Sequence, residues 1–107
     1  MTARRLGDFQ RFHRALDKAK NFNPDLFLNF VLLQEEIGEM ARAVVQHWKT
    51  GQQDREPIPS EKLRLEMADV LAYLLKIANY TGVDLETAYL EKMAVNRQRM
   101  WDSSAGE

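Results

Sequence analysis

Four carboxylates in this sequence occur as two pairs with the same spacing. Glu36 and Glu39 are three residues apart, and so are Glu66 and Asp69. Residues three apart lie side by side on one face of a helix. Glu36 and Glu66 also interrupt stripes of residues that otherwise look like core. Counting by three and four along the helix from either of them meets apolar residues. These apolar residues are Leu32, Leu33, Met40, Ala43 and Val44 around Glu36, and Leu63, Val70 and Leu74 around Glu66.

Carboxylates in such stripes are costly to desolvate, and neighbouring like charges add to the cost. The positions three and four residues away offer too few Lys and Arg side chains to neutralise four acids. A divalent cation would neutralise them, and carboxylate oxygens suit Mg²⁺ or Mn²⁺. The alternative is a solvated acidic helix face. A di-iron carboxylate bundle needs a His three residues after a Glu, and these positions are Glu39 and Asp69.

A third pattern lies near the C-terminus. Lys92, Asn96 and Arg99 stand at i, i+4 and i+7, so one helix face would present two cations and an amide. Such a face can bind phosphate oxygens, and Arg can do so with two parallel hydrogen bonds. A charged and solvated C-terminal helix is the alternative.

Apolar residues at helical spacing divide the chain into four segments joined by Pro and Gly positions. The expected helices cover about 6–20, 24–49, 60–80 and 84–99, with a loop over 51–60. No segment alternates convincingly with the period of a strand. Helices joined by short turns predict an all-α, four-helix-bundle-like fold.

Short polar residues and glycine mark the ends of these helices. Asn23 is a plausible N-cap for the second helix, with Pro24 at its first position. Ser60 and Asp84 can cap the third and fourth helices in the same way. Gly82 follows the third helix and can end it in a left-handed conformation.

Composition limits the other functions. The chain has 107 residues, which fits one domain, and 45% of them are hydrophobic, so some apolar surface is expected to be covered in a homo-oligomer. With no Cys and only His13 and His47, a thiolate zinc site and a multi-histidine site are excluded. We expect a cytoplasmic protein without a membrane partner, because neither a signal peptide nor a membrane span is visible.

The net charge of −1 indicates no polyanionic partner. The first twenty residues carry six basic and two acidic side chains, which could attract nucleic acid. Without interleaved aromatic residues or a groove-binding motif, we prefer a solvated helix face there.

The two acidic motifs also resemble those of a known family. Glu36–Ala41, followed 27 residues after Glu39 by Glu66–Leu71, resembles the E-x-x-E…E-x-x-D signature of all-α NTP pyrophosphatases. The likeness is closest to the small MazG-like and dCTP pyrophosphatase branch. Lys92–Arg99 is similar to that family's K-x-x-x-N-x-x-R segment. The similarity covers about residues 6–100, so we expect residues 1–107 to be a single MazG-like domain.

The resemblance implies a nucleotide pyrophosphohydrolase, which cleaves a nucleoside triphosphate to the monophosphate and pyrophosphate. It implies that four residues ligate Mg²⁺, with Mn²⁺ as a substitute, and these are Glu36, Glu39, Glu66 and Asp69. Glu35 is a weaker candidate, as an outer-shell group or as a base that orients the attacking water. A solvated Glu35 is the alternative. It also implies that Lys92, Asn96 and Arg99 bind the substrate.

The resemblance also concerns the residues that would bind the nucleotide base. Trp48 lies nine residues after Glu39 in a Gln-x-Trp context, and His13 and Phe22 lie where the small dCTP pyrophosphatases place a His and an aromatic residue. Phe22 departs from the pattern because it cannot donate the hydrogen bond of an indole. All three residues could instead be ordinary core residues.

The favoured substrate is therefore dCTP or a modified pyrimidine nucleotide, in nucleotide-pool cleansing, with a dimer or tetramer as the assembly. The alternative from another class is a catalytically silent helical module that binds metal or a partner protein.

Overall fold

The computed structural model describes residues 4–52 and 60–105. It consists of four α-helices, α1 (Leu6–Lys20), α2 (Leu26–Gly51), α3 (Glu61–Thr81) and α4 (Leu85–Ala105). Within these described ranges there is no strand, so the all-α prediction is confirmed. Residues 53–59 of the expected loop lie outside the described residues. None of the four helices combines the length and the apolarity that crossing a bilayer requires, as far as the chain is described.

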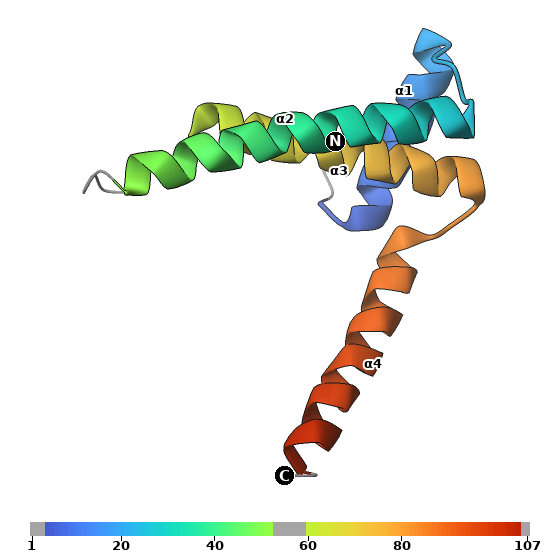
Figure 1. Cartoon of the computed structure of the whole chain (residues 1–107). Coiled ribbons are helices and arrows are strands. Elements are labelled where there is room, and N and C mark those ends of the chain that lie inside the picture. Colours follow the sequence, from blue (N-terminus) through green and yellow to red (C-terminus); the bar gives the residue numbers. More distant parts are fainter. Residues whose placement is uncertain (1–3, 53–59, 106–107) are drawn as a thin grey trace.

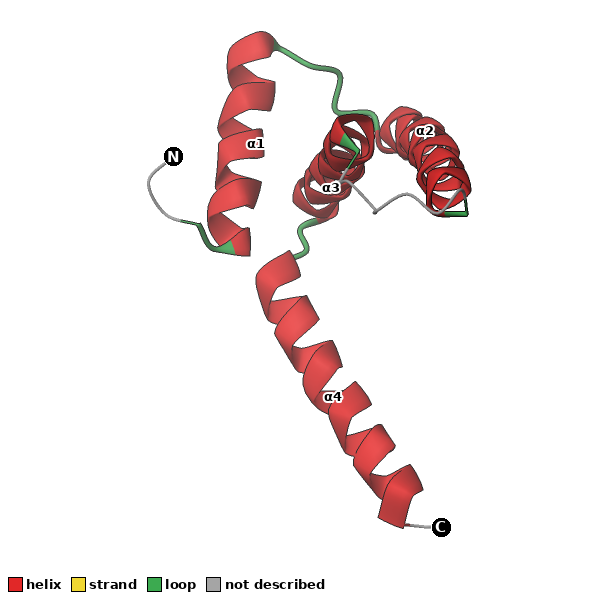
Figure 2. Ribbon diagram, turned by 90° about the vertical axis from the view of Figure 1, so that its left-hand side faces the viewer, coloured by secondary structure: helices red, strands yellow, loops and turns green. Residues whose placement is uncertain are grey.

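Three of the helices pack side by side, and the fourth leaves them. α3 lies between α1 and α2 (Figure 2), and α2 runs antiparallel to α3 (Figure 1). α4 meets α1 near its own start and then diverges from α2 and α3. The Cα radius of gyration is 17.6 Å, whereas a compact domain of this length has about 13 Å. The four helices therefore do not close into a bundle within one chain.

The second helix begins later than expected. Asp25 is the N-cap, and its carboxylate accepts a hydrogen bond from Leu28 N at 2.7 Å. Asn23 Oδ1 instead accepts from Asp25 N at 3.0 Å, which makes a turn before the helix. The prediction that Asn23 caps this helix was therefore wrong, and Pro24 precedes the cap. A carboxylate at the N-cap also interacts favourably with the helix dipole.

The three other predicted caps, at Ser60, Asp84 and Gly82, are confirmed. Ser60 Oγ accepts from Leu63 N at 3.2 Å, and Asp84 Oδ1 accepts from Thr87 N at 3.2 Å. Gly82 ends α3 with φ at +71°, a conformation that costs glycine little. α4 extends past the expected end at residue 99 to Ala105, because no Gly or Pro interrupts it earlier.

The core of the single chain is thin. The buried apolar residues among those described are Leu33, Ala43, Leu75 and Ala78. By contrast, large apolar side chains stand in solvent on α2 and α4, and Phe27 and Trp101 are 74% and 71% exposed. Exposed apolar patches of this kind usually mark a contact with another molecule.

The N-cap assignment predicts a difference between two substitutions. Asp25→Ala should lower the free energy of unfolding by about 1 kcal/mol, because Leu28 N loses its acceptor. Asp25→Asn should leave the free energy nearly unchanged, because Asn is an equally good cap. Urea denaturation at one fixed protein concentration measures both. Equal losses for the two variants would show that the carboxyl group acts through charge and not as a cap.

Candidate metal centre

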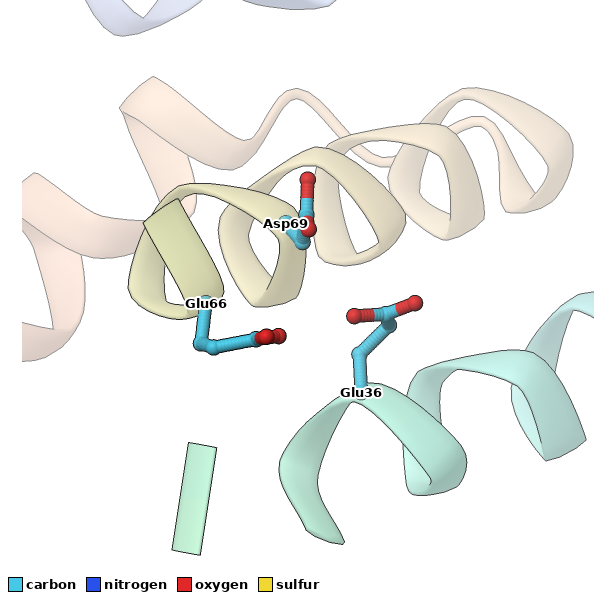
Figure 3. A group of neighbouring side chains, drawn as sticks. All are labelled: Glu36, Glu66 and Asp69. Atoms are coloured by element: carbon cyan, nitrogen blue, oxygen red, sulfur yellow. The ribbon is translucent and has the colours of Figure 1, made fainter. Parts of the chain in front are cut away.

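The antiparallel packing of α2 on α3 brings three carboxylates together. Glu36 faces Glu66 and Asp69 across the helix pair (Figure 3). One oxygen from each carboxylate lies within 4.8 Å of the others. Glu36 and Glu66 are half-buried, and Asp69 is exposed. We call these three residues the acidic cluster.

Local sequence explains this placement. On α2, Glu36 stands one turn after the buried Leu33 and two turns before the buried Ala43, so it occupies the face that contacts α3. On α3, Glu66 and Asp69 are one turn apart and project toward the same side. The expectation that these glutamates interrupt a core stripe therefore matches their half-buried positions.

The acidic cluster is electrostatically strained. The pKa of the Glu36 carboxyl is raised, first by desolvation and then by four neighbouring negative charges. In falling order, these are the charges of Asp69, Glu66, Glu39 and Glu35. No Lys or Arg in the described part of the chain forms an ion pair with the cluster. A cation would relieve this repulsion.

Glu39 and Glu35 lie beside the cluster. Glu39 is half-buried one turn beyond Glu36, and it is outside the group of three that converge within 4.8 Å. Its charge nevertheless contributes to the raised pKa of Glu36. Glu35 is exposed, which suits either an outer-shell role or a solvated side chain. Three of the four predicted ligands are thus brought together directly.

The donor set fits a hard divalent cation. Three converging carboxylates without a counter-charge offer oxygen ligands alone, which Mg²⁺ and Mn²⁺ prefer. No histidine belongs to this group of described residues, so a zinc or di-iron centre is disfavoured. The structure therefore supports a site for a divalent metal ion between α2 and α3.

A second polar group continues from the cluster along α3. Tyr73 is four residues after Asp69, and its pKa is raised first by burial and then by the charges of Glu36 and Asp69. Lys76 follows one turn later, with Nζ 5.1 Å from the centre of the Tyr73 ring. Asp69, Tyr73 and Lys76 stand at i, i+4 and i+7, so this stripe was visible in the sequence but was missed.

Lys76 is paired with an acid of α1. Its Nζ lies 3.5 Å from Asp17 Oδ1, and both side chains are largely buried, at 13% and 11% exposed. Tyr80 OH donates a hydrogen bond to Asp17 Oδ2, which raises the pKa of Tyr80, after burial as the main cause. Asp17 Oδ1 is buried without a hydrogen-bond partner in the described structure. The sequence alone does not reveal this pair, because it forms only when α1 packs on α3.

Two predicted base-binding residues lie near this pair. The Phe22 ring, 45% exposed, lies beneath Lys76, whose Nζ is 5.0 Å from the ring centre. His13 is half-buried, and its pKa is lowered by burial, with Asp17 opposing and Lys76 adding to the shift. Trp48 lies near the end of α2 with 61% of its surface exposed, so it is not part of this chain's core.

The three residues predicted to bind phosphate are not brought to the acidic cluster. Lys92 and Arg99 are exposed on α4, and Asn96 is half-buried. α4 runs away from α2 and α3 (Figures 1 and 2). Within one chain this face therefore stays apart from the carboxylates.

The sequence is similar to that of a known protein family. The sequence profile of the MazG nucleotide pyrophosphohydrolase domain matches residues 28–100. The chain belongs to the MazG family. The MazG match includes α3 and both acidic motifs, together with Lys92, Asn96 and Arg99, but not α1.

Individual relatives add detail. The chain is 41% identical over 68 residues to dCTP pyrophosphatase 1 of Homo sapiens. This match covers 60% of this chain and 39% of the human protein. The chain is 39% identical over 69 residues to a dATP/dGTP diphosphohydrolase of Cyanophage S-2L, covering 64% of this chain and 51% of the phage protein. The chain thus spans about two fifths to half the length of these MazG relatives.

The raised pKa of Glu36 predicts an effect on stability. In metal-free protein at pH 7, Glu36→Gln should raise the Tm, because ionised Glu36 is repelled in the folded state. A raised folded-state pKa means that this cost is absent at low pH, so the gain should vanish below the usual carboxyl pKa of 4.5. Thermal melts at pH 7 and pH 4 with EDTA measure it, with Glu91→Gln, an exposed acid on α4, as the control. A Tm that falls at pH 7 would contradict the electrostatic account.

Proposed function

We propose that this protein is a divalent-metal-dependent nucleoside triphosphate pyrophosphohydrolase. The observation that carries the proposal is the uncompensated acidic cluster between α2 and α3 in a chain that belongs to the MazG family. Mg²⁺ is the proposed cofactor, with Mn²⁺ as a substitute. The protein acts as a single MazG-like domain over residues 1–107, in the cytoplasm.

The acidic residues have distinct parts in this proposal. Glu36, Glu66 and Asp69 hold the metal, and Glu39 joins them from the next turn of α2. The bound metal would offset the negative charge of the triphosphate and polarise a phosphoryl oxygen. Glu35, exposed beside Glu36, can accept a proton from the attacking water at a carboxylate oxygen.

The reaction is a hydrolysis of the anhydride between the α and β phosphates. The water oxygen forms a new bond to phosphorus, and the bond from phosphorus to the bridging oxygen breaks. The proton lost by the water passes to a carboxylate, and the products are a nucleoside monophosphate and pyrophosphate. Because little covalent chemistry falls to the protein, positioning and charge dominate catalysis.

In this proposal, a second copy of the chain brings its phosphate-binding face to the acidic cluster of the first. In one chain, α4 carries Lys92, Asn96 and Arg99 away from the acidic cluster. A homo-oligomer, either a dimer or a tetramer, would cover the exposed apolar side chains of α2 and α4 and bring such a face to the cluster. The large radius of gyration and the thin core support this arrangement.

The proposed substrate is dCTP or a modified pyrimidine nucleotide, in cleansing of the nucleotide pool. His13, Phe22 and Trp48 are the proposed base-binding residues. An aromatic ring stacked on a base contributes about 1–3 kcal/mol, and Phe22 and Trp48 are exposed enough to stack. The name of the human relative supports dCTP, whereas that of the phage relative concerns purine nucleotides.

The proposed activity is tested by pyrophosphate release. Wild-type protein should release pyrophosphate from a nucleoside triphosphate with Mg²⁺ and not with EDTA. Glu39→Gln and Asp69→Asn should each abolish turnover, because they remove a metal-binding oxygen, while circular dichroism stays unchanged.

The matched control for these variants is Glu61→Gln on α3. Glu61 is exposed and pairs with Arg64, so this variant should keep the wild-type rate. Full activity in Glu39→Gln or in Asp69→Asn would refute the ligand assignment. No release from any nucleotide by folded wild-type protein would leave a silent helical module as the better account.

A separate prediction concerns Trp48. Trp48→Ala should raise KM for the preferred nucleotide with little change in kcat, because stacking binds ground and transition states alike. Steady-state kinetics with the favoured substrate measures both constants. An unchanged KM would remove Trp48 from the base site and assign its exposed ring to another surface.

A further inference from the structure

A buried amide joins α1 to the turn between α3 and α4. Gln10 is 5% exposed and uses both ends of its side chain. Its Nε2 donates to Asn79 Oδ1 at 3.1 Å and to Val83 O at 3.0 Å, and its Oε1 accepts from Leu85 N at 2.7 Å. Asn79 Nδ2 returns a hydrogen bond to Gln10 O at 2.9 Å. One side chain of α1 therefore contacts the end of α3, the turn and the first residue of α4.

A second link lies outside the first. Glu86, in the first turn of α4, accepts hydrogen bonds from Gly7 N at 3.1 Å and from Arg5 Nη2 at 2.6 Å. The Gly7 hydrogen bond is the main reason that the pKa of Glu86 is lowered. Both links hold the start of α4 on α1, and the acidic cluster on α2 and α3 is not part of either.

Farther along, α4 exposes large apolar side chains. Tyr89, Leu90, Met93 and Val95 are all exposed, and the helix extends away from the other three (Figure 1). Within one chain, the described contacts between α4 and α1 lie where α4 begins, so these contacts set its direction. Arg99 lies 14 residues beyond Leu85, which is about 21 Å along the helix axis. A tilt of about 10° at Leu85 would move Arg99 by about 4 Å, far more than a hydrogen bond tolerates.

We infer that Gln10 is a positioning residue, which fixes the angle at which α4 leaves α1 and α3 and thereby places the phosphate-binding face of α4. This inference rests on the proposed function for the roles of Lys92, Asn96 and Arg99. Gln10 touches neither the acidic cluster nor these three residues, so its effect passes through the direction of the helix. It follows that losing Gln10 weakens nucleotide binding while leaving metal binding intact.

The test combines kinetics with a direct measurement of the helix. The chain has no cysteine, so single cysteines at Arg64 on α3 and Arg97 on α4 can carry spin labels. Diluting the labelled chains with unlabelled protein keeps the measured distance within one chain. The variants are Gln10→Leu and, in case that variant fails to fold, Glu86→Ala, which removes only the outer link. Thr81→Ala is the control, because Thr81 ends α3 beside the same turn and its hydroxyl donates to Ile77 O and Ala78 O within α3.

The expected result is a broader or shifted distance distribution in Gln10→Leu and a smaller change in the same direction in Glu86→Ala. KM for the nucleotide should rise in Gln10→Leu, and kcat/KM should fall about tenfold or more, since a misplacement of 1 Å can cost about a hundredfold in rate. Mn²⁺ affinity measured by calorimetry without nucleotide should stay within about twofold of wild type. Thr81→Ala should match wild type in all three measurements.

Two results would overturn the inference alone. One is an unchanged distance distribution in both variants. The other is a changed distribution with unchanged KM, while wild-type protein is active. A wild-type protein that releases no pyrophosphate under any condition would overturn the proposed function, and the role of Gln10 in nucleotide binding with it.

Discussion

Mutual repulsion of carboxylates at the α2–α3 interface is the constraint on which the rest of the structure depends. Glu36 is half-buried on the face by which α2 contacts α3, and it meets Glu66 and Asp69 there with no cation from the described chain. A helix pair with apolar residues at these positions would gain stability from burying them. Keeping acids there costs stability, and a bound divalent cation is the interaction that would offset this cost.

The same helix pair connects the site to the rest of the molecule. α3 carries Glu66 and Asp69 toward Glu36 of α2, and on another side it carries Tyr73 and Lys76 toward Asp17 of α1. One helix thus links a region suited to a metal ion with a region lined by rings and a largely buried ion pair. A rise of 1.5 Å per residue separates Asp69 from Lys76 by about 10 Å, so an extended ligand could contact both.

Local patterns in the sequence predicted the helices and three of their caps, because spacing and short polar side chains act within a few residues. Part of the acidic cluster was predictable for the same reason, since Glu66 and Asp69 share one helix face whatever the tertiary structure. Glu36 meets them only through the packing of α2 on α3. Asp17 and Lys76 were not found, because they meet only through the packing of α1 on α3. The divergence of α4 was not predicted either, because its apolar residues would fit a bundle within one chain or a contact between chains.

The central claim is that Glu36, Glu66 and Asp69 bind a divalent cation. The most direct measurement is a crystal structure of the protein grown with Mn²⁺, with anomalous data collected to locate the ion. We predict an anomalous peak between the three carboxylates, at metal–oxygen distances of about 2.0–2.3 Å. A crystal in which this position holds only water, with Mn²⁺ present in solution at millimolar concentration, would contradict the account.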